Sequence, residues 1–103
     1  MKQIPSFHDD LIRRLKNPKK AIGYLNAALE DEDPNVFLLA LRYVAEAYGG
    51  MTRISHLTHV SREHIYRMLS KKGNPEFKTL QSLLNALELK LSVESKSQLK
   101  KAA

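Results

Sequence analysis

The stretch "THVSREHIYRMLSKKGNP", residues 58–75, crowds polar and cationic side chains around a narrow apolar stripe. The stripe consists of Ile65, Met68 and Leu69. Ser61 is a typical helix N-cap and Gly73 a typical helix stop, so the pattern predicts a helix over residues 62–72. Because the apolar stripe can anchor this helix on one side, its polar face is free to contact a partner.

A second, shorter helix is predicted just upstream. Thr52 can act as its N-cap, and "RISHLTH", residues 53–59, forms its body. Two short helices joined by three or four residues, the second of them basic, are typical of a helix-turn-helix. We expect both helices and their turn to pack against the preceding long helix through one apolar cluster: Ile54, Leu57, Val60, Ile65, Met68 and Leu69.

In a helix-turn-helix, the N-terminal residues of the second helix reach base edges in the major groove, while other polar groups hold phosphates. Arg62 is therefore expected to read a base, and Tyr66 to contact a phosphate. Lys71 and Lys72 lie near the predicted helix end and are expected to contact phosphates as well. The full set of candidate DNA-binding residues is Thr52, Arg53, Ser61, Arg62, Glu63, Tyr66, Arg67, Lys71 and Lys72.

Four more helices complete the predicted fold. Ser6, Asn17 and Asp33 are potential N-caps, and proline follows the last two. The helices are predicted over residues 7–17, 18–29, 34–48 and 74–89. The third predicted helix of the chain is apolar over much of its circumference, so we expect it at the centre of the core. The apolar residues expected to face inward on the other helices are Leu11, Ile12, Leu15, Ala21, Ile22, Leu25, Ala28, Leu29, Phe77, Leu80, Leu83, Leu84 and Leu87.

From Leu87 onward the pattern changes to alternation. Leu87, Leu89, Leu91 and Val93 are apolar, which predicts one short strand. A single strand has no partner within its own chain, and this favours pairing between two copies. We therefore expect a homodimer formed through the strand, the last helix or both.

The composition is that of one ordinary globular domain: 103 residues, 43% hydrophobic and 27% charged. The chain has no cysteine, so disulfides and cysteine-based zinc sites are excluded. No apolar run approaches the roughly 18 residues of a membrane span, and "MKQIPSFHDD" lacks the apolar stretch of a signal peptide. We expect a cytoplasmic protein that does not associate with membranes.

The positive charge is confined to one half of the chain. Residues 1–50 carry seven Lys and Arg against seven Asp and Glu, whereas residues 51–103 carry ten against four. The whole net charge of +6 therefore lies in the half that contains the predicted helix-turn-helix. Such a distribution favours a polyanionic partner, here double-stranded DNA, through counterion release and long-range attraction.

Two alternative chemistries compete with DNA binding. His56, His59 and His64 invite a metal site, but no carboxylate or cysteine stands beside them at a zinc-like spacing, so we expect no metal and no cofactor. Arg, His, Tyr and Lys also serve small metal-free ribonucleases, which gather these residues from separate elements around a concave surface. Here they cluster on one helix, so we expect no enzymatic activity. The acidic run "EDED", residues 30–33, is either a solvated loop or a contact for a basic toxin.

The segment "MTRISHLTHVSREHIYRMLSKKGNPEFKTLQSLLNALELKLSV", residues 51–93, resembles the Cro/cI-type helix-turn-helix of the addiction-module antidote proteins, which are HigA-like antitoxins. The most specific portions are "VSREHIYRMLS", "GNPEFKTL" and "ALELKLSV", and the resemblance extends upstream to about residue 10. Two residues depart from the family pattern. At the position of the small residue usual in the first helix this chain has Ser55, which is nearly as small as alanine. At the position of the turn glycine it has His59, which must adopt a left-handed backbone.

The resemblance implies an all-α, lambda-repressor-like domain over residues 33–94. Residues 1–32 form an N-terminal extension of two helices, expected to serve partner or dimer contacts, and residues 95–103 a flexible tail. The implied function is that of a sequence-specific antitoxin in a type II toxin–antitoxin system. It neutralises a RelE-like toxin and represses its own operon as a homodimer on a palindromic operator. A stand-alone prophage-type repressor is the alternative, and a small ribonuclease is the rival from the enzyme class.

Overall fold

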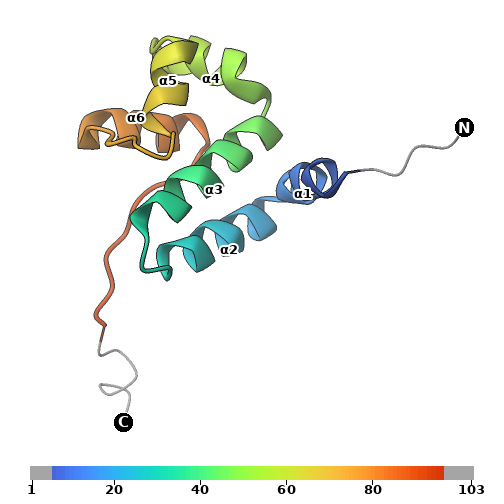
Figure 1. Ribbon diagram of the computed structural model, residues 1–103, viewed down its shortest axis with the longest axis vertical. Coiled ribbons are helices and arrows are strands. Elements are labelled where there is room, and N and C mark those ends of the chain that lie inside the picture. Colours follow the sequence, from blue (N-terminus) through green and yellow to red (C-terminus); the bar gives the residue numbers. More distant parts are fainter. Residues whose placement is uncertain (1–5, 97–103) are drawn as a thin grey trace, which may run out of the picture.

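In the computed structural model, which describes residues 6–96, helices are the only regular secondary structure. They are α1 (Phe7–Leu15), α2 (Pro18–Leu29), α3 (Pro34–Ala47), α4 (Gly50–Thr58), α5 (Arg62–Met68) and α6 (Phe77–Ala86). Figure 1 shows α3 crossing the middle of the molecule, with α1 and α2 on one side and α4, α5 and α6 on the other. The expected all-α class is confirmed. Within the described range, no helix is both long and apolar enough to cross a membrane.

The first three helices begin at the predicted N-caps. The Ser6 hydroxyl accepts a hydrogen bond from the Asp9 amide at 3.0 Å. Asn17 and Asp33 use their side-chain oxygens in the same way, and proline occupies the first turn of each helix that they cap. A side chain that accepts from the first turn satisfies an amide that has no partner within the helix. These three starts are therefore set by local sequence.

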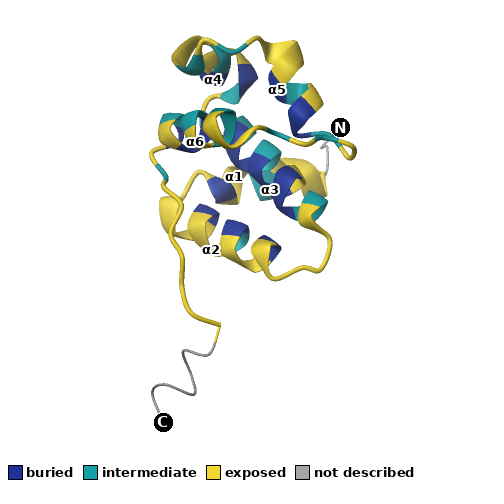
Figure 2. Ribbon diagram, turned by 90° about the vertical axis from the view of Figure 1, so that its left-hand side faces the viewer, coloured by how far each residue is buried: buried dark blue, intermediate teal, exposed yellow. Residues whose placement is uncertain are grey.

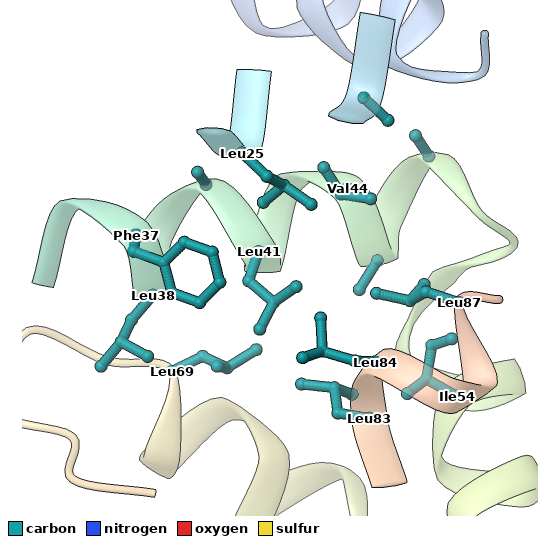
Figure 3. Close-up of a cluster of buried hydrophobic side chains, with 14 of the residues drawn as sticks. Leu25, Phe37, Leu38, Leu41, Val44, Ile54, Leu69, Leu83, Leu84 and Leu87 are labelled. Carbon is teal, nitrogen blue, oxygen red and sulfur yellow. The ribbon is translucent and has the colours of Figure 1, made fainter. Parts of the chain in front are cut away.

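The core is organised around α3, as the sequence predicts. Leu41 and Ala45 of α3 are fully buried, with no exposed surface. Figure 3 shows Leu41 between Leu25 of α2 on one side and Leu84 of α6 on the other. The buried residues of all six helices form a single apolar cluster, and no polar or charged residue of the described chain is buried. The N-terminal helices and the basic C-terminal half thus share one core.

Two helix boundaries in the basic half differ from the predictions. The predicted cap at Thr52 is wrong, because α4 already begins at Gly50 after Gly49, whose φ of 110° is readily adopted only by glycine. Helix α5, the second helix of the predicted helix-turn-helix, ends at Met68 rather than at Lys72. A Cβ at Gly73 would lie 2.0 Å from the Met68 carbonyl oxygen. The chain therefore folds back over the end of α5, and the helix cannot continue.

The close approach of Gly73 to the Met68 carbonyl predicts that a side chain at position 73 destabilises the fold. Gly73→Ala is expected to destabilise the fold by about 1–3 kcal/mol, because backbone must move to admit the methyl group. Gly23→Ala is the matched control, since Gly23 lies within α2 and has open space around it. This second change should stabilise by about 0.5–1 kcal/mol through helix propensity. Urea denaturation of both variants measures the difference, and equal midpoints would contradict the proposed close approach.

The predicted C-terminal strand is absent from the described residues. Helix α6 ends at Ala86, Leu87 is buried in the turn that follows, and residues 88–96 form no strand ladder. The Leu89 amide donates to the Leu84 carbonyl at 2.8 Å, which fixes how the chain leaves the helix. Alternation predicts a strand only where a second strand supplies hydrogen bonds, and no neighbouring segment does so here.

Four apolar side chains expected to face inward are instead exposed: Ile22, Leu29, Leu57 and Phe77. On α2, the buried residues are Ala21, Leu25 and Ala28, which form a stripe narrower than the apolar pattern predicts. Each helix packs along one line of contact, so residues at the edge of a wide apolar face stay in solvent. Leu80 lies at such an edge and is only partly buried.

Candidate nucleic-acid interface

Helices α4 and α5 are joined by a tight turn of three residues, 59–61, and together they form the α4–α5 unit, residues 50–68. His59 adopts φ 60° and ψ 28°, the left-handed conformation expected from the sequence. Its amide donates to the Ser55 carbonyl at 2.9 Å. The Ser55 hydroxyl donates to the Val60 carbonyl, and the Thr58 hydroxyl accepts from the Val60 amide. Ser55 therefore has a role beyond its small size, because its side chain fixes the turn.

The backbone of His59 provides a second stability prediction. A left-handed conformation costs a non-glycine residue about 1–2 kcal/mol. We expect His59→Gly to stabilise the fold by up to about 1 kcal/mol, because part of this gain is offset by the entropy of glycine in the unfolded chain. His59→Val should destabilise, since β-branched residues tolerate positive φ poorly. The midpoint of urea denaturation measures both effects. If the glycine variant is less stable, the His59 side chain contributes more to the free energy of unfolding than its left-handed backbone costs.

Helix α5 is anchored on one side and capped at its start. The Ser61 hydroxyl accepts from the His64 amide at 3.1 Å, as predicted. Ile65, Met68 and the following Leu69 are buried in the shared core. The remaining positions of the first turn, Arg62, Glu63 and His64, are exposed. Anchoring and exposure therefore follow the pattern that the sequence predicts, except that Leu57 does not join the apolar cluster.

The nine predicted site residues divide by location. Thr52 and Arg53 are exposed on α4, and Lys71 and Lys72 are exposed in the turn after α5. The others lie at the start of α5 or along it, where only Tyr66 is half-buried. Among described residues, the four cationic side chains Arg53, Arg62, Lys71 and Lys72 form no ion pair, and Arg67 donates a hydrogen bond to His64 Nδ1 at 3.2 Å. Cations without an internal carboxylate partner are available to an external anion.

Tyr66 packs partly buried against the core and meets Arg42 of α3, a residue that the sequence did not place in the site. The guanidinium carbon of Arg42 lies 5.1 Å from the centre of the Tyr66 ring, a cation–π distance. Arg42 Nε is buried without a hydrogen-bond partner and stands 4.0 Å from Glu46 Oε1. Glu46 Oε2 in turn lies 3.0 Å from His8 Nε2 of α1. A chain of contacts thus links the first helix to α5, and no local pattern could have predicted it.

Within residues 6–96, no three His, Cys, Asp or Glu side chains are grouped so that they could hold a metal ion. His56, His59 and His64 are exposed to solvent. The Tyr66 hydroxyl and the neighbouring cations are the hydrogen-bond donors that a phosphate accepts from. The arrangement can bind an anion along an exposed helix.

These features define an all-helical protein that presents a short cationic helix on a single shared core. The chain belongs to the family described as "Probable addiction module antidote protein", whose profile matches residues 6–95. It is 33% identical over 85 residues to an "Uncharacterized protein" of Haemophilus influenzae (strain ATCC 51907 / DSM 11121 / KW20 / Rd), across 82% of this chain and 87% of that protein. No solved structure matches the chain. The antidote family inferred from the sequence is confirmed, while its Cro/cI-type subclass remains a prediction.

Proposed function

We propose that this protein is the DNA-binding antitoxin of a type II toxin–antitoxin system and represses its own operon. The observation that carries the proposal is the exposed face of α5, with Arg62 and Glu63 beside the Ser61 cap, on a helix anchored by Ile65 and Met68. In this proposal the α4–α5 unit is a helix-turn-helix of the lambda-repressor type, and α5 enters the major groove.

The candidate DNA-binding side chains have different parts in the proposed complex. Arg62, at the start of α5, makes a bidentate contact with a guanine. Arg67, one turn further along, reaches a base or the backbone. Tyr66 and the turn residues Lys71 and Lys72 hold phosphates, which set the register of the protein on the duplex. Thr52 and Arg53 of α4 bind the backbone beside them.

The test is binding of the purified chain to the DNA upstream of its own gene. The control is a duplex of the same length and base composition in scrambled order, and both are titrated at several salt concentrations. A sequence-specific repressor binds its operator at least about 10³-fold more tightly than the control. Equal binding to both duplexes would reduce the interaction to nonspecific charge attraction and overturn the proposal.

We further propose that the protein binds its operator as a homodimer, because palindromic operators match a protein two-fold axis. Without a C-terminal strand, strand pairing no longer supports this proposal, and α6 with its exposed Phe77 is the remaining predicted contact. Sedimentation at about 50 µM should show a dimer, a generous concentration for a specific interface. A monomer both alone and on the operator would contradict the prediction.

The antitoxin role requires a toxin, which we propose to be a RelE-like ribonuclease encoded beside this gene. The test is growth of cells that express the neighbouring reading frame, with and without this protein. Rescue of growth supports an antitoxin. Operator binding without any toxicity of the neighbouring product supports a stand-alone prophage-type repressor instead. Purified protein incubated alone with RNA provides the control, since cleavage would support the ribonuclease alternative.

A further inference from the structure

A groove of about 1200 Å³ lies between α2 and the C-terminal segment, residues 87–96. Figure 2 shows this largely exposed segment running past α2. Ile22 and Leu29 of α2, both expected in the core, line the groove together with Leu89 and Leu91 of the segment. Leu29 is 53% exposed. Three exposed apolar residues therefore gather at one place, Ile22 and Leu29 of α2 and Leu91 of the segment.

A second hollow of about 460 Å³ continues this surface. Leu29 and Phe37 line both hollows, so they form a shared apolar ridge. The far side of the second hollow is formed by Gly73, Asn74 and Pro75, before α6. The docking surface, defined as these two hollows, thus runs from the C-terminal segment across the α2–α3 connection.

The docking surface is acidic on a chain of net charge +6. Five carboxylates line it, Glu30, Asp31, Glu32, Glu88 and Glu94, against two lysines, Lys90 and Lys96. None of the five forms an ion pair with a described residue. Glu88 accepts a hydrogen bond from the Tyr48 hydroxyl at 2.8 Å, which raises the Tyr48 pKa and ties the segment to the C-cap of α3. No described cation neutralises these carboxylates, so together they can attract a cationic partner.

The size and lining of the docking surface fit a protein better than a small ligand. Its larger hollow exceeds the roughly 300–1000 Å³ of ordinary ligand pockets. Within the described chain no polar side chain is buried, whereas small-ligand pockets usually enclose a few convergent polar groups. An apolar centre with a charged rim is the usual anatomy of a protein–protein interface. Like charges exclude DNA from this surface.

We propose that this docking surface binds the toxin through a cationic contact face with an apolar centre. The inference rests on the proposed antitoxin function and adds the location of the toxin site. Helix α2 lies on the opposite side of α3 from α4 and α5 (Figure 1). No residue of α5 lines either hollow, so a toxin docked at α2 leaves the proposed DNA-binding helix uncovered and allows toxin and operator to bind the same molecule together. Only residues 73–75, at the edge of the second hollow, adjoin the proposed phosphate contacts Lys71 and Lys72.

The experiment measures binding of the purified product of the neighbouring toxin gene to wild-type protein and to variants. Leu29→Lys places a cation at the apolar ridge and should weaken binding at least tenfold. The double variant Glu30→Lys and Glu32→Lys should weaken binding and reduce its dependence on salt. Leu39→Lys is the matched control, because Leu39 is 44% exposed on α3 and lies outside the docking surface. Operator binding and thermal unfolding should be unchanged in all variants.

The possible results distinguish the location of the toxin site from the antitoxin role itself. If wild-type protein binds the toxin and Leu29→Lys binds it equally well, the location is overturned while the antitoxin role stands. If wild-type protein does not bind the toxin, the antitoxin role fails and the inference fails with it. If Leu29→Lys instead converts a wild-type dimer to a monomer in sedimentation, the surface belongs to a second copy of this chain. That result also overturns the inference.

Discussion

Replacing Ile65 with alanine is expected to destabilise the protein by about 2–5 kcal/mol, the usual cost of removing a large core side chain. Ile65 has no exposed surface and joins α5 to the core that α3 organises. The truncation leaves a cavity and loosens the helix that we propose reads DNA. Because small domains are stable by only about 5–15 kcal/mol, a large part of the population should unfold at elevated temperature.

Leu57→Ala provides the control for this prediction. Sequence periodicity assigns Leu57 and Ile65 to the same apolar cluster, whereas in the structure Leu57 is 49% exposed. Removing an exposed side chain should change the free energy of unfolding by less than about 0.5 kcal/mol. Urea denaturation of both variants compares them directly. Similar losses would place Leu57 in the core and contradict the observed packing of α4.

Arg62→Ala is expected to weaken operator binding by about 1–3 kcal/mol and to flatten the preference at one base pair in each half-site. The reason is that Arg62 is exposed at the start of α5, beside its N-cap, and forms no ion pair with a described residue. The change removes no buried contact, so the free energy of unfolding should stay constant. The measurement is binding to a panel of singly substituted operators at several salt concentrations.

Lys71→Ala and Lys72→Ala are the matched controls for Arg62. Both lysines lie in the turn after α5 rather than on it, so their contacts are expected to be with phosphates. Their loss should weaken all sequences alike and reduce the salt slope by about one unit per contact. If Arg62→Ala leaves affinity and base preference intact, α5 is not the recognition helix.

Because all six helices share one core, deleting the N-terminal helices should disturb the rest of the protein. Leu15 of α1 and Leu25 of α2 are buried in the same cluster as Ile65 of α5. The His8–Glu46–Arg42–Tyr66 contacts run in the same direction, from α1 through α3 to α5. Removing the N-terminal helices therefore exposes the core that holds α5, and point variants are the better test of their role.

The sequence determined the features that depend on neighbouring residues. The N-caps at Ser6, Asn17, Asp33 and Ser61 were predictable because each side chain bonds an amide only two or three positions away. The left-handed turn at His59 was predictable from the resemblance, because His59 stands where the family has glycine, and the central place of α3 was predictable from its apolar content. The family resemblance could also be identified from local motifs, and the profile match over residues 6–95 confirms it.

Tertiary structure decided the features that join distant residues. Periodicity marks an apolar face but not the line along which a neighbour covers it, so Ile65 is buried and Leu57 exposed. The end of α5 depends on Gly73 folding back over Met68, and a strand after Leu87 would need a partner strand that none of the described residues provide. Arg42 meets Tyr66 only because the fold places one side chain of α3 within reach of α5. Local hydrogen bonds are determined by short stretches of sequence, whereas burial and pairing depend on where whole elements dock.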